Sequence, residues 1–152
     1  MSSFSTSLPK DKLLKASSDH KFIQMVSNGQ ITTQQFNTWL TQDYLFVTDY
    51  IRLVAHTIVN APQQDYTLLI DGLSALKEEL IWFSNKLKEK DIRIDDIKPL
   101  SANLAYQHWL AELIHTKKSY LGLITAVYAI EFCYCEAWKS VKNPVYQEFA
   151  SR

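Results

Sequence analysis

The sequence predicts an all-α protein, and three observations lead to this fold class. Only 3 Gly and 4 Pro occur in 152 residues, fewer than the turns of a strand-rich protein normally require. The stretch from residue 33 to residue 60 contains neither Gly nor Pro. Its apolar residues recur at intervals of three and four, the spacing of an amphipathic helix, at Leu40, Tyr44, Val47, Ile51, Val54 and Ile58.

Length and composition favour one globular domain. The chain is 47% hydrophobic and 21% charged, and 152 residues are enough for one core. Sixteen basic and sixteen acidic residues cancel, which argues against nucleic acid as a partner, because phosphate binding needs clustered positive charge. No apolar run approaches the roughly 20 residues needed to cross a bilayer, so no membrane partner is expected. No signal sequence is recognisable, and we expect the protein in the cytosol.

The N-terminal part is expected to contain two short helices. Residues 1–18 would form a leader that includes a first short helix at Lys10–Ser17. A second helix would follow, capped by Ser18 or Asp19. Gly29 would end it, as Gly commonly does after a helix C-terminus.

Longer helices make up the rest of one domain, at residues 19–152. Thr32 or Thr33 would cap the first of them and Ser101 the third, with a short connector at residues 91–99. Asn143-Pro144 has the signature of a further helix start. The long helices are expected at residues 33–61, 65–90, 101–115 and 117–142.

The two cysteines are not expected to form a disulfide or a metal site. Cys133 and Cys135 are two residues apart in a helix, and their side chains therefore point about 200° apart. The chain has no other Cys, so we expect free buried thiols and no bound metal.

Asp43 is the first candidate for a functional residue. It lies beside the apolar stripe of residues 33–60, where a carboxylate is desolvated, hydrogen-bonded or turned to solvent. A solvated residue at the edge of the helix is the simpler interpretation.

Other carboxylates occur close to aromatic residues at helical spacing. Glu131 is three residues from both Tyr128 and Tyr134, and Glu78 and Glu79 precede Trp82. Aromatic stripes usually belong to the core. Carboxylates beside rings can also hold a flat, nitrogen-rich heterocycle, with the rings stacking on it and the carboxylates accepting from its amino groups.

Four segments together resemble the TenA family of thiamine-salvage enzymes. They follow in the family's order and cover nearly the whole chain from about Asp19, at residues 20–29, 36–47, 76–83 and 129–146. The position of a nucleophilic Cys in the better-known branch is Ile130 here, with Glu131 next to it. The chain therefore resembles the branch that has Glu in place of Cys.

The resemblance implies a heme-oxygenase-like helical bundle that hydrolyses an aminopyrimidine derived from thiamine. Asp43 would hold the exocyclic amine and the ring nitrogen, and Glu131 would act as general acid or base. Further residues of the substrate pocket would be Phe46, Glu79, Tyr106 and Tyr134. No cofactor is implied, and the family's dimers or tetramers suggest a homo-oligomer.

Three expectations remain open. Family members continue beyond Arg152, so the domain is expected to be incomplete at its C-terminus. A non-catalytic TenA-like remnant, which binds pyrimidine or only associates with a homologue, is the alternative to an enzyme. A heme protein with His20 as axial ligand is a further hypothesis, although a lone His beside Asp19 is more often a cap or surface residue.

Overall fold

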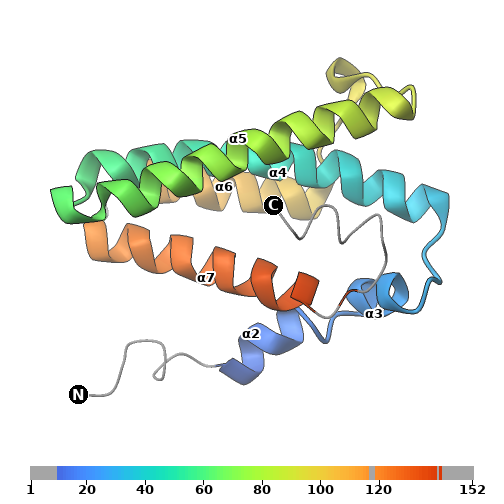
Figure 1. Cartoon of the computed structure of the whole chain (residues 1–152), viewed down its shortest axis with the longest axis horizontal. Helices are drawn as coiled ribbons and strands as arrows, with labels where there is room; N and C mark the ends of the chain where they lie inside the picture. The colour runs from blue at the N-terminus through green and yellow to red at the C-terminus, as the bar shows by residue number, and fades with distance from the viewer. Residues whose placement is uncertain (1–9, 117–118, 140, 142–152) are drawn as a thin grey trace. The chain divides into compact units, whose positions relative to one another are not determined.

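The computed structural model describes residues 10–116, 119–139 and 141, and its regular elements in these ranges are all helices. Figure 1 shows the long helices as coiled ribbons, with no strand in the part of the chain that is described. The prediction of an all-α fold is confirmed.

The chain divides into two compact units, which are described separately. The first unit contains the described residues up to Ile31 together with those from Tyr128 onward. The second unit contains residues from Thr32 to Val127. Helix α7 (Tyr120–Lys139) contributes its first part to the second unit and its remainder to the first.

Three long helices build most of the second unit, and α4 packs against both of the others. In Figure 1, α4 and α6 run in the same direction and α5 runs in the opposite one. Two 3-10 turns lie in the connections between these helices: η1 precedes α5 and η2 precedes α6. The bounds are α4 Thr33–Asn60, η1 Gln63–Asp65, α5 Tyr66–Glu89, η2 Ile94–Asp96 and α6 Ser101–His115.

Local sequence signals set both ends of α4. Thr32 and Gln35 form a capping box, in which the Thr32 side chain accepts from the Gln35 N–H and the Gln35 side chain accepts from the Thr32 N–H. The helix stops at Asn60, ahead of Ala61-Pro62, because the residue before a proline disfavours the helical conformation. The predicted cap and end of this helix are confirmed.

The burial of α4 differs from the predicted single stripe. Leu40, Val47 and Val54 are buried as expected, whereas the other members of that stripe are only half-buried. Tyr50 and Leu53 are buried to 1% and 0% exposure although the stripe did not include them. The reason is that α4 contacts two helices and therefore buries a wider arc of its surface.

The predicted cap of α6 was wrong by one residue. Leu100 is the N-cap, with no capping bond from its own side chain, and Ser101 is the first helical residue. The connector at residues 91–99 is confirmed and contains the η2 turn.

The first unit begins with two short helices, α2 (Lys10–Ala16) and α3 (Lys21–Ser27). His20 caps α3, instead of Ser18 or Asp19, and its Nδ1 accepts the Phe22 N–H at 3.2 Å. Gly29 follows α3 with φ +66°, a left-handed conformation that Gly adopts without strain, so its predicted role is confirmed.

Helix α7 bears on the expectation that no apolar run is long enough to cross a bilayer. It has 20 residues, and an 18-residue window within it has a mean hydropathy of 1.2, so by length and composition alone it is long and apolar enough to cross a membrane. A core helix of a bundle meets the same criterion. The predicted helix start at Asn143-Pro144 lies outside the described residues.

Candidate functional site

Three of the predicted site residues come together on α4 and α6. The rings of Phe46 and Tyr106 meet edge to face, with centroids 5.3 Å apart and an interplanar angle of 67°. Asp43 lies one helical turn before Phe46 on α4, at the spacing that makes side chains neighbours. It is half-buried, with its Oδ2 atom inside the protein, which fits a boundary position on the helix.

The ring pair is the middle of a longer aromatic row. Tyr50 stacks on Phe46 at 5.5 Å with the planes 12° apart, and Trp109 lies 5.2 Å from Tyr106. The row begins at Tyr50, which is 1% exposed, and reaches the surface at Trp109, which is 38% exposed. An aromatic row that is partly open beside a carboxylate is suited to a flat ring that carries amino groups.

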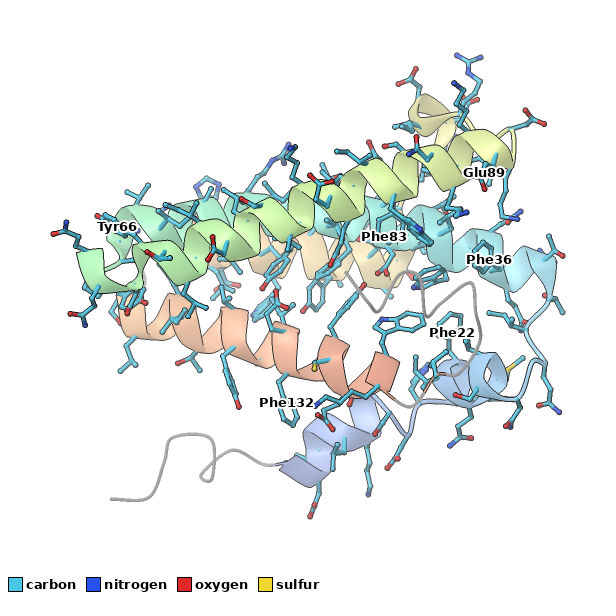
Figure 2. The ribbon with its side chains drawn as sticks, in the orientation of Figure 1. Phe22, Phe36, Tyr66, Phe83, Glu89 and Phe132 are labelled. Atoms are coloured by element: carbon cyan, nitrogen blue, oxygen red, sulfur yellow. The ribbon has the colours of Figure 1, made fainter. Side chains whose placement is uncertain are left out.

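A second aromatic cluster belongs to the core. The Trp39 ring on α4 lies 6.3 Å from Trp82 and 5.8 Å from Phe83 on α5, and both α5 residues are buried. Phe36 extends the cluster at 5.5 Å from Trp39, and Figure 2 labels Phe36 and Phe83 on their two helices. For Trp82 and Phe83 the interpretation of aromatic stripes as core is confirmed, whereas Phe36 and Trp39 are half-buried.

Glu79 lies half-buried on α5, whereas its neighbour Glu78 is exposed and pairs with Lys77 at 3.3 Å. This agrees with the expectation that one of the two carboxylates faces solvent. A role for Glu79 in substrate binding stays a prediction.

Glu131 and Tyr134 lie on the part of α7 that belongs to the first unit, whereas Asp43 belongs to the second. Tyr134 is half-buried and Glu131 is exposed. In the described part of the chain the Glu131 side chain is thus open to solvent. The Tyr128 and Phe132 rings stack on each other with centroids 6.1 Å apart. The roles of Glu131 and Tyr134 rest on the resemblance.

The cysteines are free, as predicted, but they are not both buried. Cys133 is half-buried and burial raises the pKa of its thiol, whereas Cys135 is exposed. Among the described residues, no three His, Cys, Asp or Glu side chains gather in a way that could hold a metal ion.

A groove of about 440 Å³ between α4 and α6 is a feature that the sequence did not suggest. At 100° per residue its α4 residues lie about 120–240° around the helix from Asp43, and Asp49 is one helical turn after Phe46. An ion pair of Asp49 and Arg52, at 2.8 Å, lines one wall. The remaining lining residues are Ala55, His56, Val59, Gln107, Leu110, Ala111, Ile114 and His115.

Comparison with known proteins decides the family. The model described as the TENA/THI-4/PQQC family matches residues 10–152. The chain belongs to this family. The resemblance that the four sequence segments suggested is thus confirmed at the level of the family.

Two curated relatives of this TENA/THI-4/PQQC protein carry functional names. A probable bifunctional TENA-E protein of Glycine max is 33% identical over 139 residues, covering 88% of this chain and 61% of the relative. An aminopyrimidine aminohydrolase of Halalkalibacterium halodurans is 24% identical over 134 residues, covering 85% of this chain and 59% of the relative. The chain thus spans about 60% of the length of these curated relatives.

Solved structures show the same fold. A TenA homologue from Pyrococcus furiosus superimposes with a TM-score of 0.88 at 28% identity, over 99% of this chain and 75% of the other. A TenA homologue from P. horikoshii superimposes with a TM-score of 0.70 at 21% identity, over 93% of this chain and 75% of the other. At this identity the likeness shows the fold alone. The TENA/THI-4/PQQC family member is therefore a TenA-like helical bundle.

Proposed function

We propose that this family member binds a thiamine-derived aminopyrimidine and hydrolyses an amine or amide group on it, as part of thiamine salvage. The observation that carries the proposal is the half-buried Asp43, one helical turn before Phe46, whose ring contacts that of Tyr106. The name of one curated relative, an aminopyrimidine aminohydrolase, supports the same substrate class.

Binding is assigned to residues of the second unit. The Asp43 carboxylate would accept from the exocyclic amine of the pyrimidine, a charge-assisted hydrogen bond that is stronger than a neutral one. Phe46 and Tyr106 would contact the faces or edges of the ring, with Glu79 as a further acceptor. Phe46 is able to stack but has no proton to donate.

The chemical step is assigned to Glu131, with Tyr134 as a pocket residue. A carboxylate general base would take a proton from water as the water oxygen attacks the carbon that bears the amine. The C–N bond would break as the C–O bond forms, and the leaving amine would receive the proton, so that an aminomethyl group and water become a hydroxymethyl group and ammonia. A positioned acid or base contributes about 10²–10⁴-fold to such a rate.

Binding without turnover is the second candidate. The chain corresponds to about 60% of the length of its curated relatives, so their activity is not transferred to it by similarity. A pyrimidine-binding module would share the binding residues and lack the hydrolysis. Location in the cytosol and assembly into dimers or tetramers also stay predictions.

The binding step is tested by calorimetry with 4-aminopyrimidine and hydroxymethylpyrimidine as probes. We expect both to bind the unmodified chain, and Asp43→Asn to lose affinity because the amide replaces an acceptor with a donor. Loss of a hydrogen bond to a charged group costs about 1.5–3 kcal/mol, or about ten- to more than a hundred-fold in affinity.

Asp49→Asn is the matched control. It removes a carboxylate from the same helix on the side of the groove, where Asp49 pairs with Arg52, and should leave probe affinity unchanged. Equal affinities for the unmodified chain and Asp43→Asn would remove Asp43 from the site. Release of ammonia from an aminomethyl-aminopyrimidine then separates an enzyme from a binding module.

A further inference from the structure

Gln42, the residue before Asp43, joins α4 to the start of α6 by a set of hydrogen bonds. Its side-chain Nε2 donates to the Lys98 carbonyl at 3.0 Å, and its Oε1 accepts from the Leu100 N–H at 2.9 Å. The Asn103 Nδ2 donates to the Gln42 carbonyl at 2.7 Å and approaches Oε1 at 3.2 Å. Residues 56 to 61 positions apart are thereby held together.

These bonds replace a local cap that the sequence of α6 lacks. Leu100 is the N-cap of α6, and its apolar side chain cannot accept a hydrogen bond. In a capping box, the side chain at the third helical position accepts from the N-cap N–H. Asn103 occupies that position, but its amide points to Gln42 and the Oε1 of Gln42 accepts from Leu100 instead. The beginning of α6 therefore depends on a residue of α4.

The same bonds set the axial register of the two helices. Because α4 and α6 run in the same direction, one turn onward from Gln42 and Asn103 leads to Phe46 and Tyr106, whose rings are in contact. A slip of α6 by one residue would move Tyr106 by about 1.5 Å along the axis and rotate it by about 100°. Such a slip would break the edge-to-face contact.

We propose that Gln42 is a positioning residue, whose amide fixes the start of α6 against α4 and so holds Tyr106 beside Phe46 next to Asp43. The proposal rests on the proposed function for its consequence in pyrimidine binding. Its geometric part, the placement of the Tyr106 ring, does not depend on any ligand.

Gln42→Met is the test, since methionine keeps the length of the side chain and removes its amide. Two quantities are measured: the NMR shifts of the Tyr106 ring protons, which sense the neighbouring Phe46 and Trp109 rings, and the affinity for 4-aminopyrimidine. We expect the Tyr106 shifts to move toward those of an isolated tyrosine and the affinity to fall about ten-fold, within the coupling range of contacting residues.

Two controls separate positioning from loss of stability. Gln34→Met changes an exposed glutamine of the same helix that makes no side-chain hydrogen bond in the described part of the chain, and should alter neither quantity. Thr32→Ala removes the α4 cap and should lower resistance to urea without moving the Tyr106 shifts or the affinity. Asn103→Ala removes two of the contacts and serves the same test if Gln42→Met does not fold.

The outcomes are distinct. Unchanged Tyr106 shifts in Gln42→Met, or an equal change in Thr32→Ala, would overturn the positioning role. Altered shifts together with an unmodified chain that does not bind 4-aminopyrimidine would refute the proposed function and leave the placement of Tyr106 by Gln42 supported. If Gln42→Met and Asn103→Ala act through the same contacts, the double variant should lose less affinity than the two single losses combined.

Discussion

Helix α7 carries two carboxylates, Glu131 and Glu136, and two thiols that could act as base or nucleophile, and Glu136 is paired with Lys139. Burial raises the pKa of the Cys133 thiol, which lowers the fraction of reactive thiolate at neutral pH. Cys135 is exposed and lies one helical turn from Glu131. By the resemblance described above, the nucleophile of the Cys branch would correspond to residue 130, which is the buried Ile130 here. Proton transfer by the Glu131 carboxylate is therefore the better hypothesis.

This hypothesis predicts opposite results for the two kinds of substitution. Cys133→Ser combined with Cys135→Ser should keep most of any hydrolysis, whereas Glu131→Gln should lose about 10²–10⁴-fold because an amide cannot accept and return a proton. Ammonia release from an aminomethyl-aminopyrimidine is the measurement. Glu136→Gln, on the same helix and paired with Lys139 at 2.6 Å, is the control and should remain active. An inactive double serine variant with an active Glu131→Gln would show thiol chemistry instead.

At the scale of elements, one side-chain bond ties the start of α7 to the turn before α5. The Tyr120 hydroxyl donates to the Asp65 carboxylate at 2.6 Å. Burial, together with the hydrogen bond and negative charge of Asp65, raises the pKa of Tyr120 to about 12. Each of these causes disfavours the phenolate, since it would be less hydrated and would face a second negative charge.

The sign of this shift predicts how stability depends on pH. A pKa that is higher in the folded than in the unfolded chain gives stability that is present below about pH 10 and is lost as pH rises toward 12. Urea unfolding at pH 8 and at pH 11 measures how far the free energy of unfolding falls between these two pH values. This fall should be smaller for Tyr120→Phe than for the unmodified chain. Tyr66→Phe changes the exposed first residue of α5, and this variant should lose as much stability between pH 8 and pH 11 as the unmodified chain. An equal loss in all three proteins would contradict the role of the Tyr120–Asp65 bond.

At the scale of the whole molecule, stability depends on the residues that α4 buries. Leu53 is 0% exposed on α4, whereas Leu68 on α5 is 72% exposed. Leu53→Ala should lower the free energy of unfolding by about 2–5 kcal/mol, because it removes apolar contacts and leaves a cavity. Leu68→Ala should change it by no more than about 0.5 kcal/mol, as surface substitutions usually do. Chemical denaturation followed by circular dichroism measures both, and similar losses would show that the burial of α4 is not as described.

The sequence alone determined the helices of this protein. Apolar periodicity predicted the extent of α4 and α5, and the Thr32 cap and Gly29 predicted where helices begin and end. These features are readable because each depends on residues within a few positions of one another. The family resemblance was readable for the same reason, since its motifs are short and follow in order.

The tertiary structure decided which side chains meet. The contact of Phe46 with Tyr106, the supply of the α6 cap by Gln42 and the groove behind Asp49 all join residues more than fifty positions apart. The exposure of Glu131 and the half-burial of Asp43 were likewise set by packing. A helical pattern shows which residues share a face, but the rotation and axial register of one helix against another follow from contacts along their whole length. These two quantities determine whether a carboxylate and an aromatic pair form a site.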